Sequence, residues 1–380
     1  MWLRNNGMLS RGVCKVQIRA GTLRSWLFLW LVLGVGLAVP AHAGLLDRLT
    51  GIDAGVKGIE KSCRKGDASR CISAGNMYRY GKSFGQKGTK VTKDLDKAIE
   101  LYRLGCLGGD RKSCHALYQI GFDDSRGKRT KVNISRAVQL FTAACEGSAS
   151  GKYSGPACRE LAKLNLKGKG LPKDVSHGVE LLLRGCDRFS RQACRDLGNI
   201  LLEGSLVSRD VPGAVAALGK GCEGKKKDPQ ACARLGVLFS KGEQVKRDLS
   251  AAEIYLTEGC TFPDRVGTAC YELARLYETE LSGRKSEEEI SQLYRIACDR
   301  ADSKRVGAAC AAAAERHLQG KGVKKNRNAA IHLYNRGCML KHRESCRRSC
   351  EWNCKEGQPH ACAAVKSGKY PLGVSNCFRP

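Results

Sequence analysis

The residues most able to form covalent bonds are the cysteines, of which the 380-residue chain has 21. From residue 63 to residue 346 they form close pairs whose members lie 8 to 13 residues apart. So high a cysteine content is typical of a chain that folds in an oxidising compartment, where neighbouring thiols form disulfides. We therefore predict bridges within the pairs Cys63 and Cys71, Cys106 and Cys114, Cys145 and Cys158, Cys186 and Cys194, Cys222 and Cys232, Cys260 and Cys270, Cys298 and Cys310, and Cys338 and Cys346.

Four further cysteines, Cys350, Cys354, Cys362 and Cys377, leave three connectivities open. The recurring eight-residue spacing favours Cys354 with Cys362, which leaves Cys350 for Cys377. Cys346, Cys350 and Cys354 recur at intervals of four residues, on one side of a predicted helix. Together with His360 they could supply ligands to a zinc ion. Because an oxidising compartment favours disulfides, the sequence predicts no metal site.

Other reactive side chains lack the partners that catalysis would need. Ser62 to Lys65 and Ser282 to Lys285 match the S-x-x-K motif of serine β-lactamases, but the accompanying S-D-N and K-T-G motifs are absent from the sequence. The histidines form no H-E-x-x-H motif, and His317 occupies a position filled elsewhere by apolar residues. We therefore predict no catalytic residue and no cofactor, and expect His317 to be a packing residue.

The N-terminal 43 residues have the pattern of a secretory signal peptide. Five basic and no acidic residues precede a 14-residue apolar run, Trp26 to Val39, and the small-residue site Ala41-His42-Ala43 follows. The apolar run is short for a membrane span, although an uncleaved anchor is the alternative. We predict cleavage after residue 43, export to the periplasm or the medium, and a mature chain that does not span the membrane.

The cysteine pairs recur every 36 to 43 residues, which indicates a structural repeat. Apolar residues at positions −8, −5 and −4 from the first cysteine of each pair form one stripe of an α-helix. A residue able to cap a helix N-terminus stands twelve positions before the same cysteine, and Glu289 completes a capping box in one block. These predicted caps are Asp94, Asn133, Asp174, Asp210, Asp248, Ser286 and Asn326.

A second helix is predicted after the second cysteine of each pair. Position +4 is small in Gly75, Gly198, Gly236 and Ala274, where another helix can approach closely, whereas Tyr118 breaks this rule. Glycines at positions 81, 168, 204, 242 and 320 are expected to end these helices in the left-handed conformation. The prediction is an all-α solenoid, an α/α superhelix of seven to eight disulfide-stapled hairpins. Its parts are a lead-in over 44–60, repeats over 61–346 and a cysteine-rich C-terminal cap over 347–380.

Segments such as residues 157–174 and 320–338 resemble Sel1-like repeats, which are related to TPR repeats. The paired cysteines make the chain similar to the Helicobacter cysteine-rich protein family, the β-lactamase-related, exported branch of these repeats. The resemblance covers residues 60 to about 365 and implies a protein-binding scaffold, with penicillin binding or weak β-lactamase activity as the alternative. Cysteine spacings of 10, 12 and 13 depart from the usual eight.

The chain carries 66 basic and 37 acidic residues, a net charge of +29. This excess favours anionic partners, either an acidic protein or an envelope polyanion such as lipopolysaccharide. No aromatic or groove-reading element accompanies the charge, so nucleic acid is not a predicted partner.

In superhelices of this type the first helix of each hairpin usually lines the concave groove. We predict that an extended protein or peptide, which the excess of basic residues suggests is acidic, binds there. The candidate side chains stand at positions +1 and +5 from the second cysteine of a pair and are Asn76, Gln119, Arg159, Lys163, Arg195, Asn199, Tyr271 and Arg275.

Overall fold

The computed structural model describes residues 56–81, 91–127, 132–147, 154–261, 266–300, 306–370 and Cys377. All of them belong to one compact unit that begins at Ala54. The predicted signal peptide and most of the predicted lead-in lie outside the described residues. Among the described helices, none combines the length and the apolar character needed to cross a bilayer.

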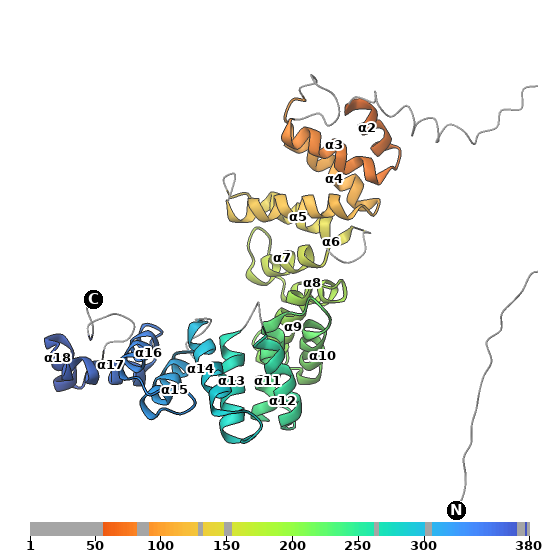
Figure 1. The fold of residues 1–380 in the computed structure, drawn as a ribbon. Coiled ribbons are helices and arrows are strands. Elements are labelled where there is room, and N and C mark those ends of the chain that lie inside the picture. Colours follow the sequence, from red (N-terminus) through yellow and green to blue (C-terminus); the bar gives the residue numbers. More distant parts are fainter. Residues whose placement is uncertain are drawn as a thin grey trace, which may run out of the picture. The chain divides into compact units, whose positions relative to one another are not determined.

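The described residues form 17 α-helices and no strand, which confirms the all-α prediction (Figure 1). A helices, which contain the second cysteine of a pair near their N-terminus, alternate with B helices, which, except for α18, end at or next to the first cysteine of a pair. The A helices are α3 (Ala68–Tyr80), α5 (Arg111–Arg126), α7 (Ser154–Lys167), α9 (Arg191–Glu203), α11 (Pro229–Lys241), α13 (Gly267–Thr279), α15 (Val306–Gln319) and α17 (Arg343–Lys355). The B helices are α2 (Val56–Arg64), α4 (Leu95–Leu107), α6 (Ile134–Glu146), α8 (Val175–Asp187), α10 (Val211–Cys222), α12 (Leu249–Gly259), α14 (Glu287–Asp299), α16 (Arg327–Met339) and α18 (Pro359–Ser367).

Helices pack on their neighbours along the chain, as repeats of a solenoid do. Each A helix from α3 to α17 also contacts the following A helix, so the A helices form a continuous surface within this unit. The buried tyrosine, phenylalanine and leucine side chains of each B helix fill the space between its two flanking A helices. Among the described residues, the core therefore runs along the repeats, as one large cluster from α4 to α10, a second from α11 to α16, and smaller clusters beside them and at the two ends.

The predicted caps determine where the helices begin and end. All seven predicted N-cap side chains accept a hydrogen bond from the backbone N–H three residues further on. Ser286 and Glu289 form the reciprocal capping box. The five predicted C-terminal glycines have φ between +64° and +75°, a conformation that costs glycine far less than other residues. Local sequence therefore determines the bounds of these helices.

Ten disulfides join the pairs that spacing predicts, including Cys350 with Cys377 and Cys354 with Cys362. Eight of them, from Cys63–Cys71 to Cys338–Cys346, span the turn between a B helix and the next A helix, and Cys354–Cys362 spans the turn between α17 and α18. The Cα atoms of the paired cysteines lie 4.4 to 4.9 Å apart whether the spacing is 8 or 13 residues. Additional residues between the two cysteines therefore lengthen the turn, while the distance between the two bridged helix ends stays the same.

Small residues at position +4 let the B helix approach the A helix closely. A Cβ atom on Gly75 would lie 2.4 Å from the Tyr102 ring, and one on Gly198 or Gly236 would lie 2.6 Å from Leu218 or Leu256. Only the missing side chain makes room for these core residues. The predicted role of the small residue is confirmed at these positions.

Helix α5 is the exception, and the structure explains why Tyr118 does not obey the rule. This helix has 16 residues, three more than α3 or α9. Gly121, three residues after Tyr118, takes the close-contact position and faces the Phe141 ring, where an added Cβ would meet it at 3.1 Å. Tyr118 instead lies half-buried with its ring centroid 6.0 Å from that of Phe141. The packing register of α5 is thus shifted by about one helical turn.

His317 has the packing position predicted for it. Its backbone carbonyl accepts the N–H of the N-cap Asn326, just as the carbonyl of Leu201 accepts the N–H of Asp210. The side chain is half-buried between α14 and α15. The backbone hydrogen bond and the burial of the side chain are those of a residue that closes the hairpin.

Another histidine, His342, caps α17 and should make the stability of this helix pH-dependent. Its Nδ1 accepts the Ser345 N–H at 3.3 Å, which requires the neutral ring. Burial lowers the pKa of His342 below its usual value near 6.5, although nearby Glu344 opposes this shift. Because the folded state prefers the neutral form, the stabilisation is complete above about pH 6.5 and is lost as the pH falls through the lower folded pKa.

We expect hydrogen exchange of the α17 amides to accelerate between pH 7 and pH 5 in the native chain after correction for intrinsic rates. His342→Asp should remove most of that acceleration, because aspartate remains an acceptor in this range and serves as the cap at Asp110. His342→Ala should cost about 1 kcal/mol at pH 8. Equal pH dependence in the native and His342→Asp chains would contradict this role.

Candidate binding surface on the A helices

We call the side chains at positions +1, +2 and +5 from the second cysteine of each pair, which lie on the A helices, the A-helix face. An ion-pair ladder on this face joins α7, α9 and the N-cap residue of α11. The Arg159 Nε donates to Asp196 Oδ2 at 2.6 Å, and Arg195 donates to Asp196 Oδ1 at 3.1 Å and to Asp228 Oδ2 at 2.9 Å. Three consecutive repeats are therefore joined by alternating guanidinium and carboxylate groups.

The ladder is partly removed from water and has additional polar contacts. The Arg159 and Arg195 side chains are 13% and 16% exposed, and that of Asp228 is 6% exposed. The amide oxygens of Gln192 and Gln230 each accept a further bond from these arginines, at 3.0 and 2.8 Å. Bidentate and shared hydrogen bonds at low exposure hold these side chains in one geometry. The ladder therefore presents fixed donors and acceptors on the surface.

The structure brings together several of the residues predicted to bind a ligand. Glu160 accepts bonds from both Arg159 and Lys163, at 3.2 and 2.9 Å, which places Lys163 at the end of the ladder. Asn199 follows on α9 and is half-buried. On α13 the Arg275 guanidinium lies 5.9 Å from the Tyr271 ring centroid and donates to Glu272 at 3.2 Å. These side chains belong to one continuous A-helix surface.

Two predicted residues differ from this pattern. Asn76 accepts a hydrogen bond from the Tyr102 hydroxyl at 2.8 Å, and burial raises the pKa of Tyr102 to about 12, which keeps this hydroxyl protonated. Asn76 thus joins α3 to its own B helix. Gln119 is exposed, but because the register of α5 is shifted by three residues it is not the counterpart of Asn76. In this repeat, counting positions from the second cysteine therefore does not identify the equivalent residue.

The acidic members of the face were missed by sequence reasoning. Glu160, Asp196 and Glu272 stand at position +2, beside the arginines or tyrosine at position +1. The acidic residue that recurs two positions after the second cysteine could have predicted this feature. The prediction instead followed the net positive charge and included no acidic residue. The face offers both signs of charge, and not a uniformly basic groove.

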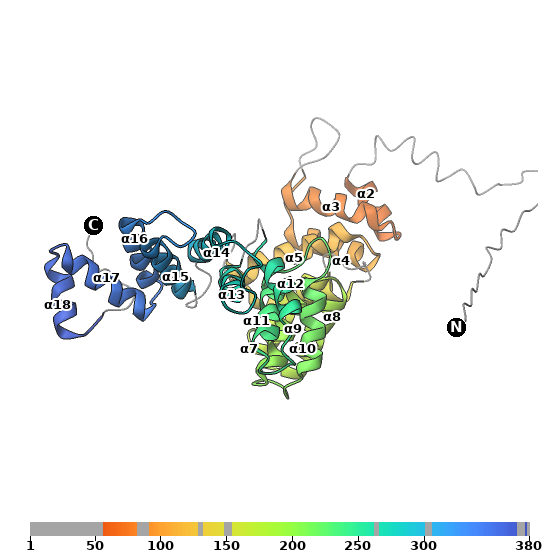
Figure 2. The ribbon, with the colours of Figure 1, turned by 60° about the horizontal axis from the view of Figure 1, so that its bottom comes forward.

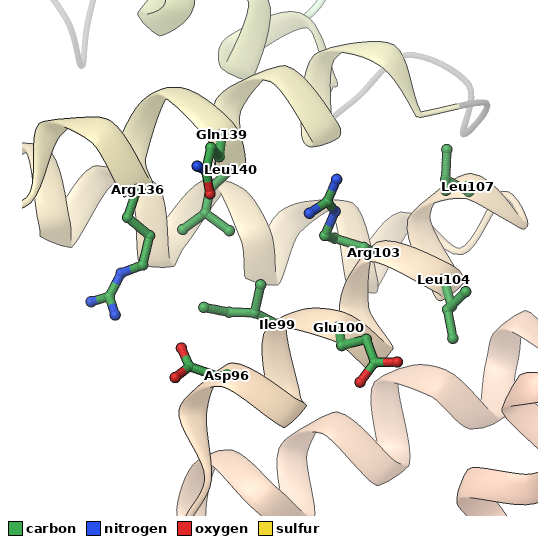
Figure 3. A pocket seen from close by; sticks show the side chains of 9 residues that line it. All are labelled: Asp96, Ile99, Glu100, Arg103, Leu104, Leu107, Arg136, Gln139 and Leu140. Carbon is green, nitrogen blue, oxygen red and sulfur yellow. The ribbon is translucent and has the colours of Figure 1, made fainter. Parts of the chain in front are cut away.

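Three hollows of the described surface lie beside B helices. One, of about 360 Å³, is lined by α4 and α6, with Asp96, Glu100, Arg103 and Arg136 around Ile99 and Leu140 (Figure 3). Two others, of about 300 and 190 Å³, lie beside α14 and between α6 and α8. All three are shallow spaces beside B helices, and sequence reasoning did not identify them.

The S-x-x-K segments and the cysteine cluster form no reactive site among the described residues. Ser282 is exposed in the loop after α13, and the ammonium of Lys285 is paired with Glu289 at 2.8 Å. Ser62 is half-buried in α2, and neither serine lines one of the three cavities. In the part of the chain that the structure describes, no three His, Cys, Asp or Glu residues are grouped to hold a metal ion.

The alternating helices, the glycine-capped loops and the polar A-helix surface define an α/α repeat protein. The Sel1 repeat profile matches residues 77–110, 114–148, 155–188, 191–216, 229–261, 267–302 and 307–342, more than half of the chain. The chain therefore belongs to the Sel1 repeat family, as the sequence pattern predicts. No curated protein shows a significant match to the sequence.

Comparison with solved structures gives one that agrees with this fold. A Sel1 repeat protein from Oxalobacter formigenes superposes with a TM-score of 0.56 at 18% identity, over 89% of this chain and 97% of that one. A protective antigen of uropathogenic Escherichia coli with an SLR fold gives a TM-score of 0.42 at 17% identity, over 85% of this chain and 77% of that one. At such low identity, the likeness to the Oxalobacter protein shows the fold alone.

Proposed function

We propose that the chain is a protein-interaction scaffold that binds an extended segment of another protein along its A-helix face. The observation that carries this proposal is the ladder from Arg159 through Asp196 and Arg195 to Asp228. A peptide offers both N–H and C=O groups, and the ladder carries donors and acceptors side by side. Side chains already held in place lose little conformational entropy when a ligand binds.

The mixed charge of the face favours a polar segment with both signs of charge over a uniformly acidic one. Each arginine of the ladder is already paired with a carboxylate, so an acidic ligand would have to compete with Asp196 and Asp228. Reversing the charge of Arg159 or Arg195 would therefore test stability and not ligand capture. Lys163 and Arg275, with side chains 34% and 53% exposed, allow a cleaner test.

The disulfides indicate an oxidising environment outside the cytoplasm. Within that environment we place the mature chain in the periplasm or in the medium, because residues 1–43 have the pattern of a signal peptide. The partner is then an exported or envelope protein. Its binding segment would be accessible in an extended form.

The experiment uses a photo-crosslinking amino acid at Lys163, at Arg275 or, as control, at Ile254. Ile254 is 62% exposed on B helix α12. After irradiation with envelope extract of the producing cell, we expect the same partner adduct from positions 163 and 275 and none from position 254. Mass spectrometry identifies the adduct. Equal adducts from all three positions, or adducts from position 254 alone, would refute binding on the A-helix face.

A further inference from the structure

The turn between α8 and α9 holds a bulky residue in an unfavourable backbone conformation. Phe189 has φ +62° and its side chain is 70% exposed. The equivalent turns place Gly66, Gly109, Lys341 and Gly357 at this position, with φ from +63° to +103°. An L-residue in this left-handed region is disfavoured relative to glycine. Since the Phe189 ring is mostly in solvent, its packing does not compensate for this cost, and the exposed aromatic ring is the feature that sets this turn apart.

The next B-to-A turn, which carries basic residues, adjoins the turn that holds Phe189. Arg191 donates to the Lys220 carbonyl, its Nη2 lies 3.4 Å from where a Cβ on Gly224 would be, and Lys220 pairs with Asp187 at 2.9 Å. The turn after α10 thus abuts the turn after α8, and helices α8 to α11 lie together in Figure 2. We call Phe189, Arg191, Lys225 and Lys226 the turn patch.

The turn patch has a net positive charge. Lys225 and Lys226 are exposed, and exposed Glu223 adds a single negative charge beside them. The next lysine, Lys227, is paired with Glu258. The positive excess therefore lies in the turn next to the one that carries the exposed ring.

Exposed apolar and basic side chains also meet in other B-to-A turns. Leu107 precedes Arg111 and Lys112, and Met339 precedes Lys341 and Arg343; Leu107 and Met339 are both exposed. In a row of hairpins, all B-to-A connections lie at one edge and all A-to-B connections at the other. The combination of apolar and basic groups is thus repeated along the edge that carries the B-to-A disulfides.

We infer that the turn patch docks the protein on an anionic lipid surface, with Phe189 entering the headgroup region and Lys225 and Lys226 beside the lipid phosphates. Lysine is a flexible point charge and does not need a partner of fixed geometry, which suits a fluid array of phosphates. Basic residues near an anionic leaflet and apolar side chains at the interface both strengthen peripheral binding. The patch residues line none of the three cavities, so the ring protrudes instead of forming a pocket for a folded partner.

The test measures cosedimentation of the mature oxidised chain with vesicles of equimolar phosphatidylglycerol and phosphatidylcholine, and with vesicles of phosphatidylcholine alone. We expect binding to the anionic vesicles that weakens with salt. Lys225→Gln and Lys226→Gln should each reduce the affinity about fivefold. Phe189→Gly should reduce it about tenfold, because the ring no longer leaves water.

Two comparisons keep the test independent of folding. Phe189→Gly should raise the midpoint of denaturant unfolding, since glycine relieves the left-handed conformation, so its weaker binding could not be ascribed to unfolding. Ile254→Ser removes an equally exposed apolar side chain from a B-helix surface and should bind like the native chain. Equal affinity for neutral and anionic vesicles, unchanged binding of Phe189→Gly, or retention on heparin without vesicle binding would overturn the inference.

Discussion

Complete reduction of the ten disulfides should unfold the mature chain at 25 °C in the absence of denaturant. Each bridge closes a loop of 8 to 13 residues, or of 27 for Cys350 with Cys377, and contributes about 2.5 kcal/mol or more on the loop-closure model. Because repeats contact only their neighbours, these local contributions add along the chain. Their sum exceeds the roughly 5–15 kcal/mol by which a typical protein is stable.

The measurement is far-ultraviolet circular dichroism of the chain after reduction in denaturant, alkylation and removal of the denaturant. Mass spectrometry establishes that all the mature cysteines are alkylated, and the matched control is the oxidised chain carried through the same steps. Retention of the native helical signal and thermal midpoint after full alkylation would show that helix packing alone sustains the fold.

Removing a single bridge provides the finer measurement. Replacement of both Cys222 and Cys232 by alanine should accelerate hydrogen exchange in α10 and α11, while α3 and α16, several repeats away, keep their native rates. Uniform acceleration throughout the chain would contradict the local action of the bridges.

The second large effect is expected at Arg136. The carboxylate of Asp124 is 2% exposed and accepts bonds from Arg136 Nε at 2.7 Å and Nη2 at 2.8 Å. This pair joins α5 to α6. Arg136→Ala removes the guanidinium that neutralises this buried carboxylate, and we expect a loss of about 3–5 kcal/mol in the free energy of unfolding.

The control is built from the neighbouring repeat. Asn165 holds the position equivalent to Asp124, since the backbone carbonyls of both residues accept the N–H of the following N-cap, and its amide donates to the Leu161 carbonyl at 3.0 Å. Asp124→Asn combined with Arg136→Ala should therefore be much more stable than Arg136→Ala alone. Denaturant unfolding measures both variants, and equal destabilisation would mean that packing, and not the unpaired charge, causes the loss.

Much of the fold follows from local sequence. The N-cap of each B helix, the glycine after most A helices and the partner of nearly every cysteine depend on residues within about a dozen positions along the chain. Such contacts form in the same way wherever the repeat occurs, so counting from a cysteine identifies them. Counting was wrong at Tyr118 and Gln119 because α5 has three additional residues, which move its C-cap to Gly127 but leave the N-cap Asn133 of the next helix at its expected distance from Cys145, and packing on α6 shows the shifted register.

The candidate site was predictable only in part. Sequence periodicity placed Arg159 and Arg195 on the exposed side of the A helices, but it did not identify their partners. Arg159 pairs with Asp196, 37 residues away, and Arg195 pairs with Asp228, 33 residues away. Those distances depend on how successive repeats are rotated and spaced, which no local pattern specifies.

The sequence by itself determined the helices, their caps, the disulfide pairs and the repeat family, because each depends on short-range contacts that recur at a constant offset. Tertiary structure alone decided that Arg159 and Arg195 are paired with carboxylates of the adjoining repeat, and that Phe189 lies exposed in the turn next to the basic turn after α10. Both outcomes depend on contacts between repeats, whose geometry is set by the packing of whole helices.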